Sequence, residues 1–382
     1  MLPILYSNDM TYFKKIQFKQ VKIDDIILVH KNKRLFTHRI IYKTEQYLIT
    51  KGDNNPESDG KIYPRQIIGK VTKVKRDGKE FDPNQIYLLQ SSLYFQEIVK
   101  IKVAFEKENI DFVFLKGLPL HLYFEKTHPK RIYADCDVLI NKKDFQKAEK
   151  IIKKFGYKKT EANNKQVENN YFKIINGFSV VFDIHLEPAF LMIQFSGLEA
   201  LYPQKLINKL TEELLINKRQ IIINGEKFSI LNSKFLILYL ASHLFHHNFR
   251  GVFRYQFLDK VIRNSRLSTN DWNKITQTIN NYQLTNFVYP VFYLLKKYYQ
   301  TPVLNDFLKS ILSSRIYHLK SIFDDEPRFT AGINRFKNIF FLSPRPLWRK
   351  LFIFFNPAVV WSIVWAIWKK LSSYFSGRQS VH

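Results

Sequence analysis

The hydrophobic pattern of the chain changes its period near residue 85, and this change most constrains the fold. Between about residues 19 and 75, short runs rich in β-branched residues alternate with turns, as in "DDIILVH" and "QIIGKVTKV". A period of two predicts the strands of a small, mostly antiparallel sheet. From "SLYFQEIVKIKVAFEKENI" onward the apolar residues recur with helical spacing. The sequence therefore predicts an α+β protein that begins with a β domain over residues 1–85.

The next segment, residues 90–215, is predicted to be a second domain with the element order βαβαββ. Its second strand begins near Asp135, and the helix after that strand ends near Gly156, because glycine commonly caps a helix C-terminus. The last two strands meet at Asn176 and Gly177, since an Asn-Gly pair favours a tight hairpin turn.

The rest of the chain divides into a hairpin with a mainly helical subdomain, residues 216–330, and a basic, aromatic tail, residues 331–382. Residues 351–368 form an uncharged run of 18, the shortest length compatible with spanning a bilayer. Tryptophans and basic flanks suit attachment to an anionic membrane surface. A helix that packs on the protein's own core is the alternative.

Composition limits the partners and the compartment. The formal net charge of +27 attracts phosphates, whether in nucleotides, nucleic acid or anionic lipid, although an AT-rich coding bias also enriches lysine. Nucleic acid is not favoured, because no binding motif accompanies the charge. Cys136 is the only cysteine, which excludes an internal disulfide and a Cys-rich zinc site. We expect a cytoplasmic protein, with attachment to the inner face of the membrane as the alternative.

Three acidic residues indicate a metal site. Asp135 and Asp137 would project from the same face of a strand that begins at or before Asp135. Two adjacent carboxylates repel each other unless a cation lies between them, and Mg²⁺ takes oxygen ligands that it shares with phosphates. Asp183 lies in a strand expected to pair nearby, and a third carboxylate allows two metals to be held. A solvated strand end is the alternative on these residues alone.

Lys116 and Gly117 lie between a predicted strand and a predicted helix. An ammonium and the backbone N–H groups of such a turn can receive a phosphate. A simple strand-to-helix turn explains the same residues equally well.

Several motifs in residues 110–260 carry a family resemblance: "LKG", "RIYADCDVLI", "FGY", "FDIHLEP" and "ILNSKFLILYLASHLFHH". This region resembles the uncharacterised nucleotidyltransferase family of the polymerase-β-like superfamily. The resemblance implies magnesium-dependent transfer of a nucleoside monophosphate from a nucleoside triphosphate, with two metals at the site.

The resemblance also implies roles for individual residues. Asp135 and Asp137 would be metal ligands, and Asp183 a ligand or base. Lys116 would contact phosphates, with Gly117 in the nucleotide-binding turn. Arg131 would contact a phosphate or orient the pair. The chain departs from the wider superfamily at Leu118, where a serine is usual.

Three histidines and one acid in the helical region receive structural interpretations. His243, His246 and His247 have a spacing that could bind zinc, but no cysteine or acid completes the ligand set. We therefore expect them to be buried or hydrogen-bonded. Asp259 is expected to make a polar contact between helices.

The first 75 residues resemble a different family, the signal peptidase I and LexA-like (S24/S26-type) serine peptidases, through "KIDDIILV", "FTHRII" and "YLITKGDNNPESDG". His38 would match the base and Asp59 the acid that orients it. Asp9 occupies the position of the nucleophilic serine, and Ser7 precedes it by two residues. A carboxylate cannot replace an activated hydroxyl, and Asp9 should instead pair with the His38 imidazolium. We expect a degenerate domain that binds a peptide or stabilises its partner.

Together these observations predict a magnesium-dependent nucleotidyltransferase fused to a peptidase-like β domain. The acceptor could be a peptide, a saccharide or another hydroxyl compound. The alternative is a membrane-associated peptidase, or peptide-binding protein, in which the second domain is only a scaffold.

Overall fold

The structure is a computed structural model of the whole chain. It describes residues 5, 8–53, 55, 57–128, 130, 132–133, 135–160, 168–188, 198–323, 325, 328–355, 357 and 360–361.

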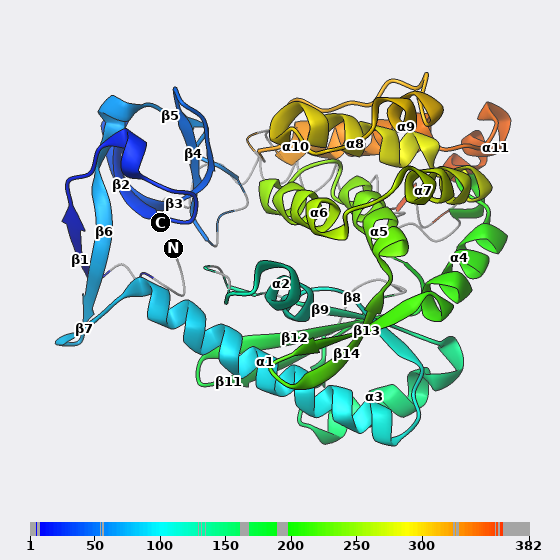
Figure 1. Cartoon of the computed structure of the whole chain (residues 1–382), viewed down its shortest axis with the longest axis horizontal. Helices are drawn as coiled ribbons and strands as arrows, with labels where there is room; N and C mark the ends of the chain where they lie inside the picture. The colour runs from blue at the N-terminus through cyan, green and yellow to red at the C-terminus, as the bar shows by residue number, and fades with distance from the viewer. Residues whose placement is uncertain are drawn as a thin grey trace.

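The N-terminal part is an antiparallel sheet, sheet A, as the period-two pattern predicts (Figure 1). Its strands run in the order β1-β6-β2-β3-β4-β5, and β7 pairs with β6. Alternate apolar residues such as Ile27, Val29 and Ile40 are fully buried and form its core. The strands are β1 (Met10–Lys14), β2 (Ile26–Lys31), β3 (Arg34–Lys43), β4 (Leu48–Lys51), β5 (Lys61–Ile62), β6 (Ile67–Arg76) and β7 (Lys79–Phe81).

A long helix, α1 (Pro83–Lys107), leads from sheet A to a second, mixed sheet. Asp82 caps this helix by accepting a hydrogen bond from the Asn84 N–H, and Pro83 fits the first turn because its missing N–H would have no helical partner there. The change of period near residue 85 thus marks a real boundary between elements.

The second sheet, sheet B, has the strand order β10-β11-β12-β9-β8-β14-β13. Both predicted hairpins are present, with Asn176, Gly177, Asn224 and Gly225 at positive φ in the turns. The second hairpin joins the sheet through β8. The elements are β8 (Phe112–Lys116), α2 (Leu118–Glu125), β9 (Cys136–Ile140), α3 (Phe145–Lys154), β10 (Lys158–Lys159), β11 (Glu168–Ile175), β12 (Phe178–His185), α4 (Gln204–Ile216), β13 (Lys218–Ile223) and β14 (Glu226–Leu231).

Helices follow sheet B. Helices α1 and α3 cover one face of the sheet, and α5 with the helices behind it stands on the other face (Figure 1). The Asn232 side chain caps α5 by accepting a hydrogen bond from the Phe235 N–H. The fold is α+β, as predicted. The helices are α5 (Ser233–His246), α6 (Val252–Ser265), α7 (Thr269–Asn281), α8 (Thr285–Tyr299), α9 (Asn305–Ser310), α10 (Arg328–Leu342) and α11 (Leu347–Leu351).

Sheet A contacts both α1 and the helical region that follows sheet B. Asp53 accepts two hydrogen bonds from Arg39, at 2.7 and 2.8 Å, and a third from the Tyr87 hydroxyl of α1 at 2.9 Å. On the other side the Tyr42 ring lies 4.9 Å from the Phe323 ring, and the Gln256 side chain of α6 donates to the Ile41 carbonyl. The β domain therefore packs on α1 and on the helical region.

The structure describes only the first part of the uncharged run over residues 351–368, which Asn356 and Pro357 interrupt in the sequence. Helix α11 ends at Leu351, and a short 3-10 helix follows at Phe352–Phe355. Pro357, Val360 and Trp361 are helical again. In the part of the chain that the structure describes, no helix is long and apolar enough to cross a membrane. Residues 362–382 lie outside that part.

Candidate active site on strands β8, β9 and β12 of sheet B

Strand register places three ionisable side chains in one row across sheet B. Parallel pairing of β12 with β9 sets Asp183 opposite Asp137, and antiparallel pairing of β9 with β8 sets Lys116 opposite Asp137. Directly paired residues project from the same face of a sheet. The Lys116 ammonium lies 2.7 Å from Asp137 Oδ2, a distance that defines an ion pair.

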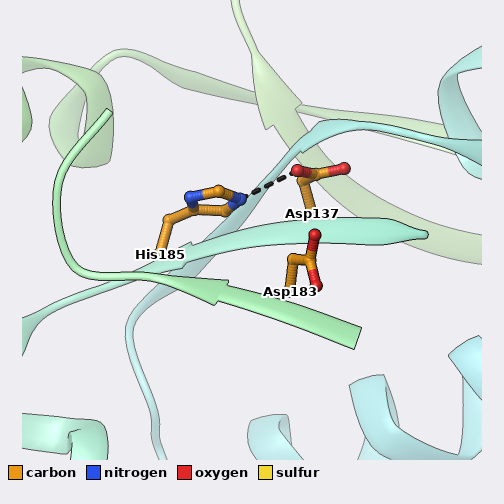
Figure 2. A group of neighbouring side chains, drawn as sticks. All are labelled: Asp137, Asp183 and His185. Carbon is orange, nitrogen blue, oxygen red and sulfur yellow. Dashed lines mark hydrogen bonds and ion pairs between the residues drawn. The ribbon is translucent and has the colours of Figure 1, made fainter. Parts of the chain in front are cut away.

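A fourth side chain, His185, belongs to the same cluster and was missed by the sequence analysis. It follows Asp183 by two residues on β12, so both project from one face. Its Nε2 lies 2.8 Å from Asp137 Oδ1, and its side chain is 2% exposed. Among the described residues, Asp137, Asp183 and His185 are a group whose possible metal-ligand atoms lie within 4.8 Å of one another (Figure 2). The period-two spacing in "FDIH" was the signal available in the sequence.

Asp135 has a different position from the one expected. Strand β9 begins at Cys136, so Asp135 precedes the strand, and its side chain is 40% exposed. It forms an ion pair with Lys116 at 3.0 Å. Asp135 therefore flanks the strand instead of lying in it, although the Lys116 ammonium contacts both Asp135 and Asp137, and the residue directly opposite Asp137 is Asp183. Arg131, which was expected to contact a phosphate or orient the two aspartates, lies outside the described residues.

The two paired carboxylates have opposite electrostatic environments. Burial disfavours ionisation of Asp137, but Lys116 and His185 outweigh it and lower the Asp137 pKa. Burial and the charges of Asp137 and Asp135 raise the pKa of Asp183 to about 8. The Lys116 pKa is raised by both aspartates, although burial opposes this. An added positive charge beside Asp183 would therefore favour its ionised form.

The donor set fits a divalent cation. Asp183 Oδ1 is buried and has no hydrogen-bond partner among the described residues. A cation held between Asp137 and Asp183 would relieve their repulsion, and carboxylate oxygens suit Mg²⁺. Because an ionised carboxylate only accepts hydrogen bonds, His185 Nε2 must be the donor to Asp137. That bond orients the Asp137 carboxylate, as second-layer contacts commonly do around metals.

Gly117 allows the chain before β9 to approach the turn between β8 and α2. Its φ of 104° lies in the region that favours glycine. A Cβ at this position would lie 3.3 Å from the Asp135 carbonyl oxygen and 3.4 Å from the Cys136 Cα. A glycine is thus needed where Asp135 and Lys116 come together.

Of the three histidines at the end of α5, His243 is buried, as expected, whereas His246 and His247 are half-buried. Their ring centroids lie between 4.6 and 5.7 Å apart. Burial, with Arg335 and then Lys116 as the next causes, lowers the pKa of His246 to about 3, so this imidazole is neutral. Lys116 also contributes to the lowered pKa values of His243 and His247, after burial. Helix α5 packs against β8, the strand that carries Lys116.

Asp259 makes polar contacts within α6 and with the segment that follows α8. It pairs with Arg263 one turn later at 2.9 Å and accepts a hydrogen bond from the Thr301 hydroxyl at 2.7 Å. These partners explain the residue without a metal.

The β domain contains part of the expected peptidase-like arrangement. The His38 Nδ1 lies 2.7 Å from Asp59 Oδ2, which also accepts a hydrogen bond from the Thr50 hydroxyl. The prediction that Asp9 pairs with His38 is wrong: both Asp9 oxygens accept hydrogen bonds from Arg76, at 2.8 and 2.6 Å. A guanidinium binds a carboxylate through two parallel bonds, which an imidazole cannot match. Ser7 lies outside the described residues.

Comparison with known proteins places the chain in a family. Residues 84–300, more than half of the chain, match the family described as uncharacterised nucleotidyltransferase. The protein belongs to this family. The matched region contains sheet B, α5 and the row formed by Lys116, Asp137 and Asp183, which we call the acid row. The β domain precedes the matched region.

Two further comparisons add little. No curated protein sequence matches the chain. A crystal structure of an antigenic nucleotidyltransferase-like protein from Paracoccidioides brasiliensis is similar at 13% identity, over 59% of this chain and 92% of that one, with a TM-score of 0.34. This similarity is too low to support an argument about fold or function.

Replacing Gly117 by alanine should destabilise the protein more than the same change in a hairpin. Gly177→Ala is the control, because Gly177 also has positive φ (80°) but no neighbouring atom within 4 Å of an added Cβ. We expect about 1 kcal/mol of lost unfolding free energy in the control and about 2 kcal/mol or more in Gly117→Ala. Urea unfolding measures both. Equal losses would contradict the close approach of the chain at Asp135.

Proposed function

We propose that the protein transfers a nucleoside monophosphate from a nucleoside triphosphate to an acceptor, with Mg²⁺ held at Asp137 and Asp183. The observation that carries this proposal is the strand register that sets the buried Asp137 opposite the half-buried Asp183, with a lysine beside them. Membership of the nucleotidyltransferase family supports the reaction class. A hydroxyl compound, including a saccharide or a hydroxyl-bearing peptide, is the acceptor class that fits such a transfer.

Each residue of the site has a proposed role. Asp137 and Asp183 would hold the metal, with Asp135 as the third carboxylate where two metals are bound. Bound Mg²⁺ would neutralise phosphate charge and favour deprotonation of the attacking hydroxyl. His185 keeps the Asp137 carboxylate oriented through its Nε2–H. Positioning and charge neutralisation account for most of the catalysis in phosphoryl transfer.

We assign to Lys116 a contact with the phosphates of the nucleotide. An ammonium has three N–H donors, and Lys116 can remain beside Asp135 and Asp137 while a further N–H bonds a phosphate oxygen. Its raised pKa keeps it charged at every pH at which the enzyme would work. Leu118 follows the turn and supplies no hydroxyl, so the backbone and Lys116 must provide the polar contacts there.

Neutralising either carboxylate of the pair should abolish transfer. Asp137→Asn and Asp183→Asn each remove a charged metal ligand, and we expect at least about a thousandfold lower rate. The assay incubates the protein with Mg²⁺, each α-labelled triphosphate and a cell extract, and separates labelled products. The matched control is Asp259→Asn, which changes an acid paired with Arg263 in the helical region and should keep full activity. Full activity in both site variants would eliminate this site.

Lys116→Gln should weaken nucleotide binding, whereas Lys116→Arg should restore part of it. We expect a loss of about tenfold or more in affinity for the triphosphate at saturating Mg²⁺, because a charge-assisted bond is removed. Isothermal titration measures this affinity. Lys218→Gln is the control, since it removes a lysine paired with Asp111 on the edge hairpin. A lower melting temperature with unchanged nucleotide affinity would show that Lys116 only neutralises the aspartates.

For the β domain we propose a peptide-binding role without cleavage. The hydrogen bond between His38 and Asp59 supports the peptidase-like resemblance. Asp9, which binds Arg76, occupies the position where the resemblance places the nucleophilic serine. A bound peptide would be presented to the nucleotidyltransferase site as the acceptor.

The β domain should not react with a fluorophosphonate probe, because an activated serine hydroxyl near His38 is required for labelling. Mass spectrometry of the treated full-length protein tests this. Labelling of Ser7 that disappears in His38→Ala would instead establish an active peptidase and favour the alternative function.

A further inference from the structure

The C-terminal part of the chain has a one-sided charge. Residues 327–382 contain no aspartate or glutamate. Four of the five tryptophans of the protein also lie there. The basic residues are Arg328, Arg335, Lys337, Arg345, Arg349, Lys350, Lys369, Lys370 and Arg378.

Within this segment the structure shows an exposed apolar surface, the tail patch, formed by Leu347, Trp348, Leu351, Phe352 and Phe355. The exposed fractions of these side chains are 63%, 59%, 46%, 56% and 78%. The ring centroids of Trp348 and Phe352 lie 6.1 Å apart and those of Phe352 and Phe355 lie 6.2 Å apart, so the aromatic residues form one surface. Clustered apolar exposure of this kind marks an interaction site, unlike single exposed residues.

The position of the tail patch suits contact with a large partner. Helix α11 lies at the end of the molecule opposite sheet A (Figure 1). The guanidinium of Arg349 lies 5.2 Å from the centre of the Trp348 ring, so a fixed positive charge adjoins the apolar surface. Trp361, the next tryptophan along the chain, is 69% exposed.

The positive charge of residues 327–382 distinguishes between two kinds of partner, a second copy of the protein and an anionic membrane. A two-fold dimer through the tail patch would bring the same surface of both copies together, and two acid-free, basic segments would then repel each other. An anionic bilayer instead attracts the basic residues, and tryptophan rings are favoured at the level of the lipid headgroups. Apolar side chains gain further free energy by entering the headgroup boundary.

We propose that the tail patch docks the protein on an anionic lipid bilayer, with Trp348, Phe352 and Phe355 inserted at the headgroup boundary and Arg349 against lipid phosphates. This docking is independent of the proposed transfer reaction, because it uses none of the residues of the acid row.

The test is sedimentation of the full-length protein with two kinds of vesicle. One kind contains only zwitterionic phosphatidylcholine, and the other also contains anionic phosphatidylglycerol. We expect binding to the anionic vesicles, weakening as salt is added, with a blue shift of tryptophan fluorescence. The triple variant Trp348→Ser, Phe352→Ser, Phe355→Ser should lower the partition coefficient at least about tenfold, because the inserted apolar area is lost.

A matched triple variant controls for apolar exposure in general. It changes Ile174, Ile216 and Ile222 to serine, at positions that are 61%, 77% and 66% exposed in the sheet B region, and it should bind as the unmodified protein does. Arg349→Gln keeps the aromatic residues and should weaken binding to anionic vesicles alone. Circular dichroism and thermal unfolding establish that each variant is folded.

Several results would overturn the proposal. These are no binding to anionic vesicles, equal binding by both triple variants, and equal binding to both kinds of vesicle. A dimer in size-exclusion chromatography with light scattering that dissociates only in the tail-patch variant, without vesicle binding, would assign the surface to contact between copies.

Discussion

Two carboxylates face each other across neighbouring strands, Asp137 buried and Asp183 half-buried, and the electrostatics of the whole site depend on this pair. Asp137 and Asp183 repel each other in a poorly solvated place, and the free energy of that repulsion has to be offset by positive charge or hydrogen bonds. The protein supplies Lys116 from one neighbouring strand and His185 from the other. Both favour the ionised form of Asp137, while the Asp183 pKa remains raised to about 8. This asymmetry is the physical reason to assign a cation to the site.

Local features of the fold could be predicted from the sequence, and pairings between distant segments could not. Asn-Gly turns and the change of hydrophobic period identify elements because they depend on residues close in the chain. The position of Asp183 opposite Asp137 depends on a parallel pairing that no local pattern encodes. For the same reason the sequence did not identify the partner of Asp9, because Arg76 is 67 residues away along the chain.

The difference at Asp135 has another cause, the precision with which a strand can be located. The Asp-x-Asp spacing predicts a common face only if both residues are extended in the strand, and β9 starts one residue later than that requires. Strand ends are the least predictable part of an element, yet the end of this strand decides which acids are buried together. His185 shows the converse: its spacing from Asp183 was visible, but its contact with Asp137 required the neighbouring strand.

The contacts of sheet A have a mechanical consequence. The β domain is fixed to α1 through Arg39, Asp53 and Tyr87, and to the helical region through Tyr42 and Gln256. Helix α1 covers one face of sheet B, and the helical region covers the other. The β domain contacts both of these layers, so it connects them in addition to the chain between them. A hinge that separated the β domain from these layers would have to break the hydrogen bond from Tyr87 to Asp53 or separate the packed rings of Tyr42 and Phe323. The β domain thus limits the movement of α1 relative to the helical region.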